Sequence, residues 1–397
     1  MKYPRLNVLL IDLESGYGGS SKSLFLSVKY IKELYDNIDI EVWALNVDGI
    51  IKKYSSIGIH VKKIGKLPRT TSGNTLKANI LELTRAGWVL YKSKKYIEAL
   101  SQDVDNRFDL VHFNLESAYL LAYFFRKKTT IPFVMHMRTI RPVNLFSRMQ
   151  MKIISGAVDH LVFISPSELE RFQLLNGEAK YTVIYNIAET YTNLPSVHHL
   201  IANENRFVVG SIANFSWDRG VDLLVEVAIE VKNNGGENEV LFVHAGHLEV
   251  PKSFPGDLGR HIRSGRSFEE YILDKGVHNM FKFIGYVDKP ENVIQGCDLI
   301  IKLFRNGSPY GRDVIEAYSL GKAVLSTGTS EVFVKHMDTG ILFPKFNARD
   351  IAKEILHCVG NSKCKEMGKK GRVNINKICS PIDRAHDIVN VWKNELN

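Results

Sequence analysis

Residues 298–324 read DLIIKLFRNGSPYGRDVIEAYSLGKAV. Two continuous apolar runs enclose a segment with glycine and proline, which predicts a buried strand, a loop, a helix and a second strand. The helix should begin near Gly311 or Arg312, where unpaired backbone amides can bind a diphosphate. Glu316 follows about one helical turn later, and its carboxylate can accept hydrogen bonds from two vicinal hydroxyls, such as those of ribose. The stretch therefore predicts adjacent phosphate and ribose sites.

Strands and helices alternate along the rest of the chain, which predicts an α/β fold with doubly wound parallel sheets. We expect first-half strands at residues 7–12, 40–45, 61–64, 110–113, 133–136, 160–165 and 182–185, with the first helix ending at Leu34. After the polar stretch 193–205 the pattern restarts, with strands at residues 207–212, 240–245, 282–284, 298–304 and 323–327.

A chain of 397 residues exceeds what one hydrophobic core usually supports, so we expect two domains. Residues 1–193 should form an N-terminal Rossmann-like domain and residues 194–380 a C-terminal one, with the boundary near Leu194. Residues 381–397 should form a helix that packs back toward the N-terminal domain.

Residues 298–324 resemble the nucleotide-sugar signature of the retaining glycosyltransferases of family 4, also called glycosyl transferases group 1. That resemblance implies the GT-B fold, with two Rossmann-like domains whose parallel sheets face each other across a cleft. It makes the first domain the acceptor side and the second the nucleotide-sugar side. In the signature, two glutamates separated by seven residues flank a Gly-containing loop. The resemblance extends through residues 321–327, 330–332 and 340–342.

The signature assigns roles residue by residue. Glu316 matches the second glutamate, which binds the donor ribose in the family, and Gly311 matches the loop glycine beside the donor phosphates. We place Tyr310 and Arg312 in the same nucleotide and phosphate site. Ser308 stands where the family has its first glutamate, which contacts the donor sugar, so the identity of the sugar stays open.

A second match to the family lies in residues 208–222, at the start of the C-terminal half. Family members usually carry Lys-Gly where Arg219 and Gly220 stand, and an arginine where Asn214 aligns; both basic residues are phosphate contacts in relatives. The planar fork of Arg219 suits phosphate, whereas Asn214 keeps a donor but loses the charge. Arg305 or Arg312 could supply the missing cation.

Gly18 and Gly19 follow the first strand and open the first helix, resembling the Gly-Gly turn that the family places below the donor phosphate. Glycine allows close backbone approach, and the helix start supplies amides. A tight strand-to-helix turn explains two glycines equally well. The segment is also one residue short of a Walker A loop, because Ser21 stands where a glycine should precede Lys22, so a P-loop NTPase is an alternative.

His136 and Arg138 should emerge at the carboxyl edge of the N-terminal sheet. The resemblance places a histidine after this strand near the donor sugar. We therefore assign His136 to catalysis together with Glu316, and His136, Arg138 and Ser308 to the donor-sugar site. His112 better suits a buried, hydrogen-bonded role, and Asn186 matches a strand-end asparagine with a structural role.

Asp103 and Asp105 have the spacing of a metal-binding Asp-x-Asp, but they stand in the polar lead-in to a strand without accompanying ligands. We expect no catalytic metal and no cofactor besides the nucleotide-sugar co-substrate. Cationic side chains and helix N-termini can stabilise the departing diphosphate instead.

Composition restricts where the protein acts. No apolar run reaches the roughly 18 residues that a membrane span needs, and no signal-peptide core precedes the first strand, so we expect a cytoplasmic protein with reduced cysteines. Basic and large apolar residues interleave in residues 83–96, which suits peripheral contact with the inner face of an anionic membrane. An amphipathic helix whose Trp88 and Tyr91 belong to the core is the alternative.

The resemblance implies transfer of a hexose-type sugar from a nucleotide diphosphate to an acceptor hydroxyl with retention. The acceptor would be a glycan or lipid-linked glycan in bacterial surface polysaccharide or glycolipid assembly. Ser308 and Asn214 also allow a catalytically weakened sugar-nucleotide-binding protein. A nucleic-acid binder is suggested only by the net charge of +9, and without a recognition motif we expect no nucleic-acid partner.

Overall fold

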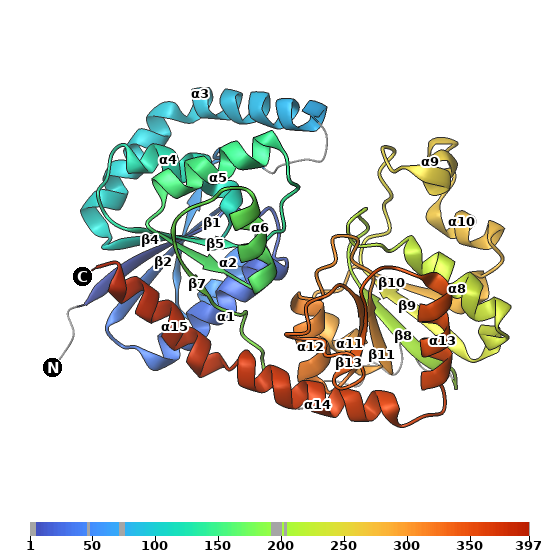
Figure 1. Ribbon diagram of the computed structural model, residues 1–397. Coiled ribbons are helices and arrows are strands. Elements are labelled where there is room, and N and C mark those ends of the chain that lie inside the picture. The colour runs from blue at the N-terminus through green and yellow to red at the C-terminus, as the bar shows by residue number, and fades with distance from the viewer. Residues whose placement is uncertain (1–4, 46–47, 71–75, 192–200, 202–204, 397) are drawn as a thin grey trace. The chain divides into compact units, whose positions relative to one another are not determined.

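The computed structural model describes residues 5–45, 48–70, 76–191, 201 and 205–396. The chain forms two compact units, of which the first comprises Met1–Ile187 with Cys379–Asn397 and the second comprises Ala188–Ile378 (Figure 1). The boundary expected near Leu194 lies outside the described residues. Each unit is built on one wholly parallel sheet with helices around it, as the alternating sequence pattern predicts.

The first unit contains a seven-stranded sheet with the order β3-β2-β1-β4-β5-β6-β7. Its strands are β1 (Leu6–Asp12), β2 (Ile38–Leu45), β3 (His60–Ile64), β4 (Leu110–Phe113), β5 (Phe133–Met137), β6 (His160–Phe163) and β7 (Lys180–Val183). The chain builds outward from β1 to β2 and β3, then returns to place β4 on the other side of β1. The carboxyl ends of β1 and β4 therefore flank the topological switch point, where open α/β sheets bind ligands.

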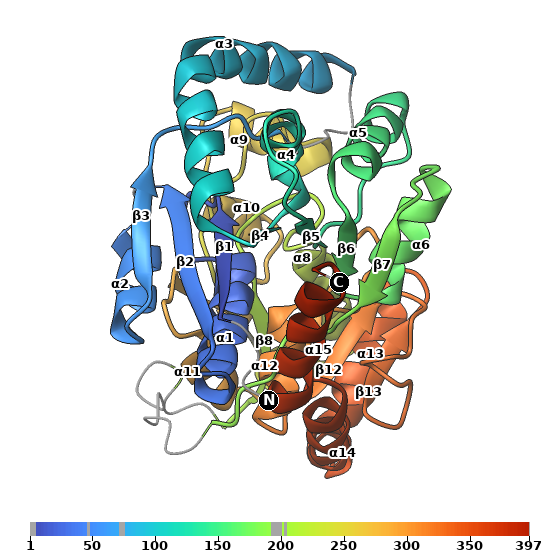
Figure 2. The same ribbon diagram turned by 90° about the vertical axis from the view of Figure 1, so that its left-hand side faces the viewer.

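Helices cover both faces of this sheet because successive strand side chains point to opposite faces. Leu9, Val111 and Met135 share a core with α3, α4 and α5, whereas Val8 and Val134 share a core with α1, α2 and α15. Figure 2 shows α15 beside α1, and the two helices are in contact. The helices are α1 (Gly19–Leu34), α2 (Asp48–Ser56), α3 (Leu76–Arg107), η1 (Glu116–Ala118), α4 (Tyr119–Arg126), α5 (Leu145–Ala157), α6 (Pro166–Leu174) and α15 (Pro381–Asn394).

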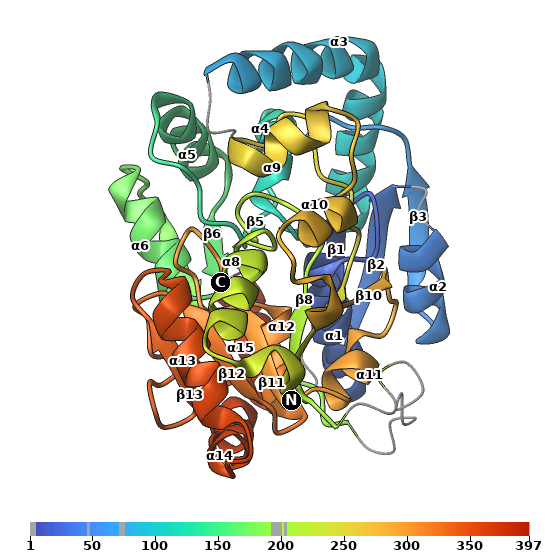
Figure 3. The same cartoon turned by 90° about the vertical axis from the view of Figure 1, so that its right-hand side faces the viewer.

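The second unit contains a six-stranded sheet with the order β10-β9-β8-β11-β12-β13 (Figure 3). Its strands are β8 (Phe207–Ile212), β9 (Val240–Ala245), β10 (Phe281–Gly285), β11 (Leu299–Lys302), β12 (Ala323–Thr327) and β13 (Gly340–Phe343). Here the order reverses between β8 and β11, so the loops that follow these two strands flank the second switch point.

One face of the second sheet shares a core with α8, α10 and α13, in which Val209, Phe242 and Leu325 take part. The helices of this unit are α8 (Leu223–Asn233), η2 (Gly236–Asn238), α9 (Gly256–Arg263), α10 (Phe268–Asp274), η3 (His278–Met280), α11 (Pro290–Gln295), α12 (Arg312–Ser319), α13 (Ala348–Cys358) and α14 (Lys363–Ile378).

Several local expectations were wrong. β6, β7 and β11 end at Phe163, Val183 and Lys302, each two residues before the predicted end, because the chain already turns into the following loop there. The strand predicted at residues 133–136 is β5, which contains His136 and ends one residue later, at Met137. Asp103 and Asp105 lie in the last turns of α3, not in a polar lead-in to a strand, because the helix continues to Arg107.

Candidate functional site at two sheet edges

The loops after β8 and β11 are tied together at the switch point of the second unit. The backbone amide of Arg305 donates to the carbonyl of Asp218 over 2.9 Å. Its guanidinium binds the Asp222 carboxylate at 2.6 and 2.9 Å. Gly220 adopts φ +62°, and a Cβ atom there would lie 2.0 Å from the carbonyl oxygen of Leu303. Only glycine permits both the left-handed backbone and this close approach.

Helix α12 begins at Arg312 with Gly311 as its N-cap, as predicted, and the N-cap residue has no side chain to cap the helix. Within the first turn, Asp313 Oδ1 accepts a hydrogen bond from the Val314 amide at 3.1 Å. A Cβ atom on Gly311 would lie 2.5 Å from the Asp313 carboxylate and 2.8 Å from Lys302 Nζ. Lys302 and Asp313 form a buried ion pair of 2.8 Å. Burial alone raises the pKa of Asp313, but the charges of Lys302 and Arg219 outweigh it and hold that pKa below its usual range. The buried ion pair between Lys302 and Asp313 thus lies directly against the start of the helix and fixes its position.

Glu316 is buried in α12, with 2% of its surface exposed. Arg312 donates to its Oε1 from both Nε and Nη2 at 3.2 Å. Burial, and after it the negative charge of Glu316, raises the pKa of Tyr191. Glu316, the residue predicted to bind the ribose, is therefore buried and held in place by an arginine one helical turn before it.

Ser308 and Tyr310 lie buried in the loop that leads into α12. The Tyr310 ring stacks on Phe333 with a centroid distance of 4.3 Å. The structure thus brings Ser308, Tyr310, Gly311 and Glu316 together on one loop and the helix that it opens.

The side chains predicted to contact phosphate differ in the partners that they have within the protein. Arg219 is exposed, and no ion pair within the described part of the chain involves it. The side-chain oxygen of Asn214 accepts a hydrogen bond from the His247 amide at 3.1 Å, which commits one end of its amide to the loop. Arg305 and Arg312 are both paired with carboxylates, so neither carries an uncompensated charge to replace the missing cation.

Gly18 is the N-cap of α1, and Gly19 is its first residue. Gly18 has φ −99°, a conformation open to any residue, and a Cβ atom there would meet nothing within 4 Å. Neither turn geometry nor packing therefore requires glycine at this position.

His136 lies buried on β5 beside His112 on β4. The two ring planes are 13° apart with centroids 4.7 Å apart, and His112 Nε2 lies 2.7 Å from His136 Nδ1, within hydrogen-bond distance. Burial, and then the charge of Arg138, lowers the pKa of His136 well below its ordinary value. The same two causes, with a smaller contribution from His160, lower the pKa of His112 to about 3. Both rings are therefore neutral near pH 7.

Arg138 ties together the ends of three strands. Its Nε donates to the carbonyl of Asn114 at 2.9 Å after β4, and its Nη1 donates to Asn186 Oδ1 at 2.7 Å after β7. Its backbone amide donates to Glu116 Oε2 at 3.1 Å. Asn186 thus takes part in the polar structure of the edge.

Two buried carboxylates at this edge were missed from the sequence. Asp12 ends β1 and Glu116 follows β4, so they lie on the strands that flank the switch point, and both are fully buried. Burial raises the pKa of Asp12 despite the favourable effects of Ser21 and Asn114. Glu116 pairs with Arg141 at 3.1 Å. For Asp12 the available signal was a charged residue directly at the end of a continuous apolar strand, whereas Asn114 and Leu115 separate Glu116 from β4.

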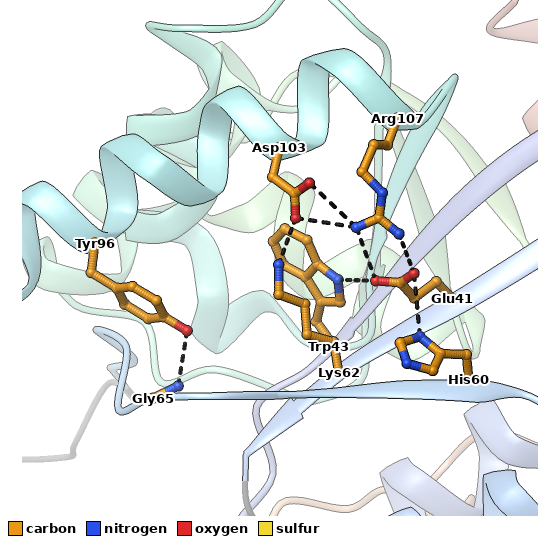
Figure 4. A network of polar contacts seen from close by, with 8 residues as sticks. All are labelled: Glu41, Trp43, His60, Lys62, Gly65, Tyr96, Asp103 and Arg107. Atoms are coloured by element: carbon orange, nitrogen blue, oxygen red, sulfur yellow. Dashed lines mark hydrogen bonds and ion pairs between the residues drawn. The ribbon is translucent and has the colours of Figure 1, made fainter.

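Asp103 of the Asp-x-Asp pair is engaged by basic side chains. Asp103 belongs to a surface network in which it binds Lys62 at 2.5 Å and Arg107 at 3.2 Å, and Arg107 also binds Glu41 (Figure 4). Among the residues described, no group of three or more histidines, cysteines, aspartates or glutamates could hold a metal ion.

Helix α3 exposes a mixed apolar and basic face. Trp88 is 60% exposed and Tyr91 82% exposed, so the alternative that these rings belong to the core is wrong. Other large apolar side chains exposed on the helix are Leu76, Ile80, Leu81, Leu83 and Tyr96, and the exposed basic residues are Lys77, Arg85, Lys92, Lys94 and Lys95. Within the described ranges, no helix is long and apolar enough to cross a membrane.

Comparison with known proteins points to one family. Residues 198–374 match the model of the family Glycosyl transferases group 1. This domain contains the loops after β8 and β11 together with Glu316. No curated protein sequence matches the chain.

Solved structures resemble the chain over nearly its whole length. Anabaena Alr3699/HepE in complex with UDP and glucose has a TM-score of 0.78 at 18% identity, covering 98% of this chain and 99% of that one. A mutant form of S. aureus TarM, in a complex that contains UDP, has a TM-score of 0.68 at 15% identity, covering 99% and 100%. Sucrose-phosphate synthase from Thermosynechococcus elongatus has 0.72 at 12%, covering 98% and 99%. The fold is that of GT-B glycosyltransferases.

Proposed function

We propose that this protein transfers a sugar from a nucleoside diphosphate to an acceptor hydroxyl, with retention at the anomeric carbon. The start of α12, with buried Glu316 one turn further along, is the observation that carries the proposal. The amides and dipole at a helix N-terminus attract a diphosphate, and the Glu316 carboxylate accepts hydrogen bonds from the ribose hydroxyls. Arg219, exposed on the adjoining loop, adds the positive charge that phosphate needs.

In this mechanism the protein positions the reactants and stabilises the charge that develops on the leaving diphosphate. Following the resemblance, the leaving phosphate serves as the base. The helix start and Arg219 neutralise the diphosphate without a divalent ion, so transfer should persist in a chelator. Arg138 holds the strand ends around His136, which contacts the donor sugar.

The first unit supplies the acceptor side. This follows the resemblance, and the carboxyl ends of β1 and β4 flank the switch point of its sheet, where open α/β sheets bind ligands. We assign the acceptor to a glycan or lipid-linked glycan of bacterial surface polysaccharide or glycolipid assembly.

The exposed face of α3 holds the protein peripherally at the cytoplasmic side of an anionic membrane. Aromatic rings favour the headgroup region, and each basic residue near such a surface contributes about 1 kcal/mol. Trp88 and Tyr91 supply the rings, and Lys92 lies 5.0 Å from the Trp88 ring centre.

A screen of nucleoside diphosphates and nucleotide sugars for protection against thermal unfolding tests the donor assignment. A ligand that binds only the native state raises the midpoint by mass action. UDP is the first probe, because the HepE and TarM structures contain it. Release of free sugar or transfer to an added glycan in EDTA then separates an enzyme from a protein that binds without catalysis. Absence of protection by every donor contradicts the proposal.

A further inference from the structure

Three buried ring side chains form a hydrogen-bonded chain inside the first unit. The indole Nε1 of Trp392 donates to His112 Nδ1 at 2.9 Å, and His112 Nε2 lies 2.7 Å from His136 Nδ1. The exposed fractions of Trp392, His112 and His136 are 1%, 1% and 3%. Water therefore does not compete for these contacts.

The direction of this chain follows from its first member. An indole nitrogen can only donate, so His112 Nδ1 must be the acceptor and its proton must sit on Nε2. His112 Nε2 then donates to His136 Nδ1, which must accept. The proton of His136 is consequently on Nε2. A second proton on either ring would place two hydrogens against each other, so the geometry also keeps both rings neutral.

The pKa shifts agree with this assignment. Burial lowers the pKa of both histidines, and the neighbouring Arg138 lowers it further. The sheet explains why the rings meet: His112 pairs in register with Val134, two residues before His136, so both rings lie on the face that α15 covers.

Helix α15 is held against this face by further polar contacts. Glu395 Oε1 lies 3.1 Å from His160 Nδ1 on β6, and the hydroxyl of Tyr35, at the end of α1, contacts His386 Nδ1. These contacts, together with the apolar packing of Ile388 and Val391, fix where the Trp392 indole lies.

We infer that Trp392 is a positioning residue that acts through His112 to fix His136 as an Nε2–H hydrogen-bond donor. A histidine fixed in this way donates to an oxygen and cannot remove a proton. The target of the His136 Nε2–H group, an assignment that rests on the proposed function, is an oxygen of the donor sugar. The same tautomer excludes His136 as the general base. The reaction then does not depend on titration of His136 near neutral pH.

The test is nitrogen-15 NMR of the histidine rings, which distinguishes the two tautomers without any substrate. Wild-type His136 should show a protonated Nε2 and an unprotonated Nδ1, unchanged between pH 5.5 and 8. Trp392→Phe keeps an aromatic side chain but removes the indole N–H donor. The hydrogen bond between His112 and His136 can then run in either direction, so the ring-nitrogen signals of both histidines should move to intermediate values. An Nδ1–H tautomer in the wild type, or an unchanged spectrum in Trp392→Phe, overturns the inference.

Two further variants keep the test specific. Glu395→Gln disturbs the His160 contact at the C-cap of α15 and should leave the His136 tautomer unchanged. His112→Asn removes the middle member of the hydrogen-bonded series and should free the His136 tautomer as Trp392→Phe does.

The kinetic consequence is a separate test. If Trp392→Phe changes the NMR signals, kcat/KM for the donor should fall about tenfold with unchanged affinity for the nucleoside diphosphate. A moved spectrum with wild-type kinetics overturns the sugar contact of His136, whereas absence of donor binding by the wild type overturns the proposed function.

Discussion

A Cβ atom on Gly220 would lie 2.0 Å from the carbonyl oxygen of Leu303. The loop after β8 and the end of β11 thus touch backbone to backbone at the switch point of the second unit. The proposed phosphate site depends on this contact, because Arg219 immediately precedes the glycine.

Gly220→Ala should destabilise the second unit strongly. The left-handed backbone costs a non-glycine residue about 1 kcal/mol, and displacement of the Leu303 carbonyl adds about 1–3 kcal/mol. Gly235→Ala is the matched control, because Gly235 has φ +83° but open space around its Cβ position. Urea unfolding of both variants measures the difference. Equal losses of stability would show that the loop contact can relax freely.

Glu316→Gln should weaken binding of the nucleoside diphosphate by about tenfold or more, because an amide loses charge-assisted hydrogen bonds to ribose. The buried Arg312 also loses its charged partner, so the unfolding midpoint must be measured together with affinity. Glu269→Gln, an exposed change on α10, is the control. Titration calorimetry with UDP gives the affinity. Wild-type affinity in a folded Glu316→Gln protein would refute the ribose assignment.

Arg219→Ala should weaken binding of the nucleoside diphosphate about tenfold while leaving the much weaker binding of the nucleoside unchanged, because its proposed partner is phosphate. Arg260→Ala removes another exposed arginine of the same unit, one that pairs with Asp257, and should change neither affinity. Equal losses for nucleotide and nucleoside in Arg219→Ala would place this residue outside the phosphate site.

Acid should destabilise the second unit partly through His244, whose pKa burial lowers to about 4. Between the ordinary histidine pKa of about 6.5 and pH 4, the unfolded chain binds a proton that the folded chain does not. Protonation of His244 therefore does not affect the free energy of unfolding above about pH 6.5. Below that pH it lowers the free energy of unfolding by about 1.4 kcal/mol for each pH unit.

His244→Asn should flatten the pH dependence of unfolding below pH 6.5 by that amount. Wild type and variant should show parallel curves above pH 7, which serves as the internal control. Parallel curves over the whole range from pH 4.5 to 7.5 would show that His244 becomes protonated in the folded protein.

Replacement of Lys92, Lys94 and Lys95 with glutamate should abolish binding to anionic vesicles at low salt, since each cation near the surface contributes about 1 kcal/mol. Co-sedimentation with anionic and neutral vesicles measures this. The control replaces Lys365, Lys369 and Lys377, exposed lysines of α14, and makes the same change in net charge. Equal losses in the two variants would indicate a general charge effect and not docking through α3.

The sequence predicts the strands and the start of α12 well, because continuous apolar runs and the glycine at position 311 are local signals. It does not reveal that Arg312 binds Glu316 or that Arg305 binds Asp222, since either arginine could equally face solvent. The exposure of Trp88 depends on which face of α3 packs, and apolar periodicity left two answers. The link from Trp392 to His112 spans 280 residues, a distance that no local pattern encodes.

Helix α15 also determines the order in which the protein can fold during synthesis. The ribosome makes residues 379–397 after the whole of the second unit, yet these residues belong to the first unit. One face of the first sheet therefore stays without Trp392 and Ile388 until the second unit has emerged. The second unit, continuous in sequence, can complete its core first, which reverses the usual order of co-translational folding. Until that moment the nascent first unit exposes apolar surface to chaperones.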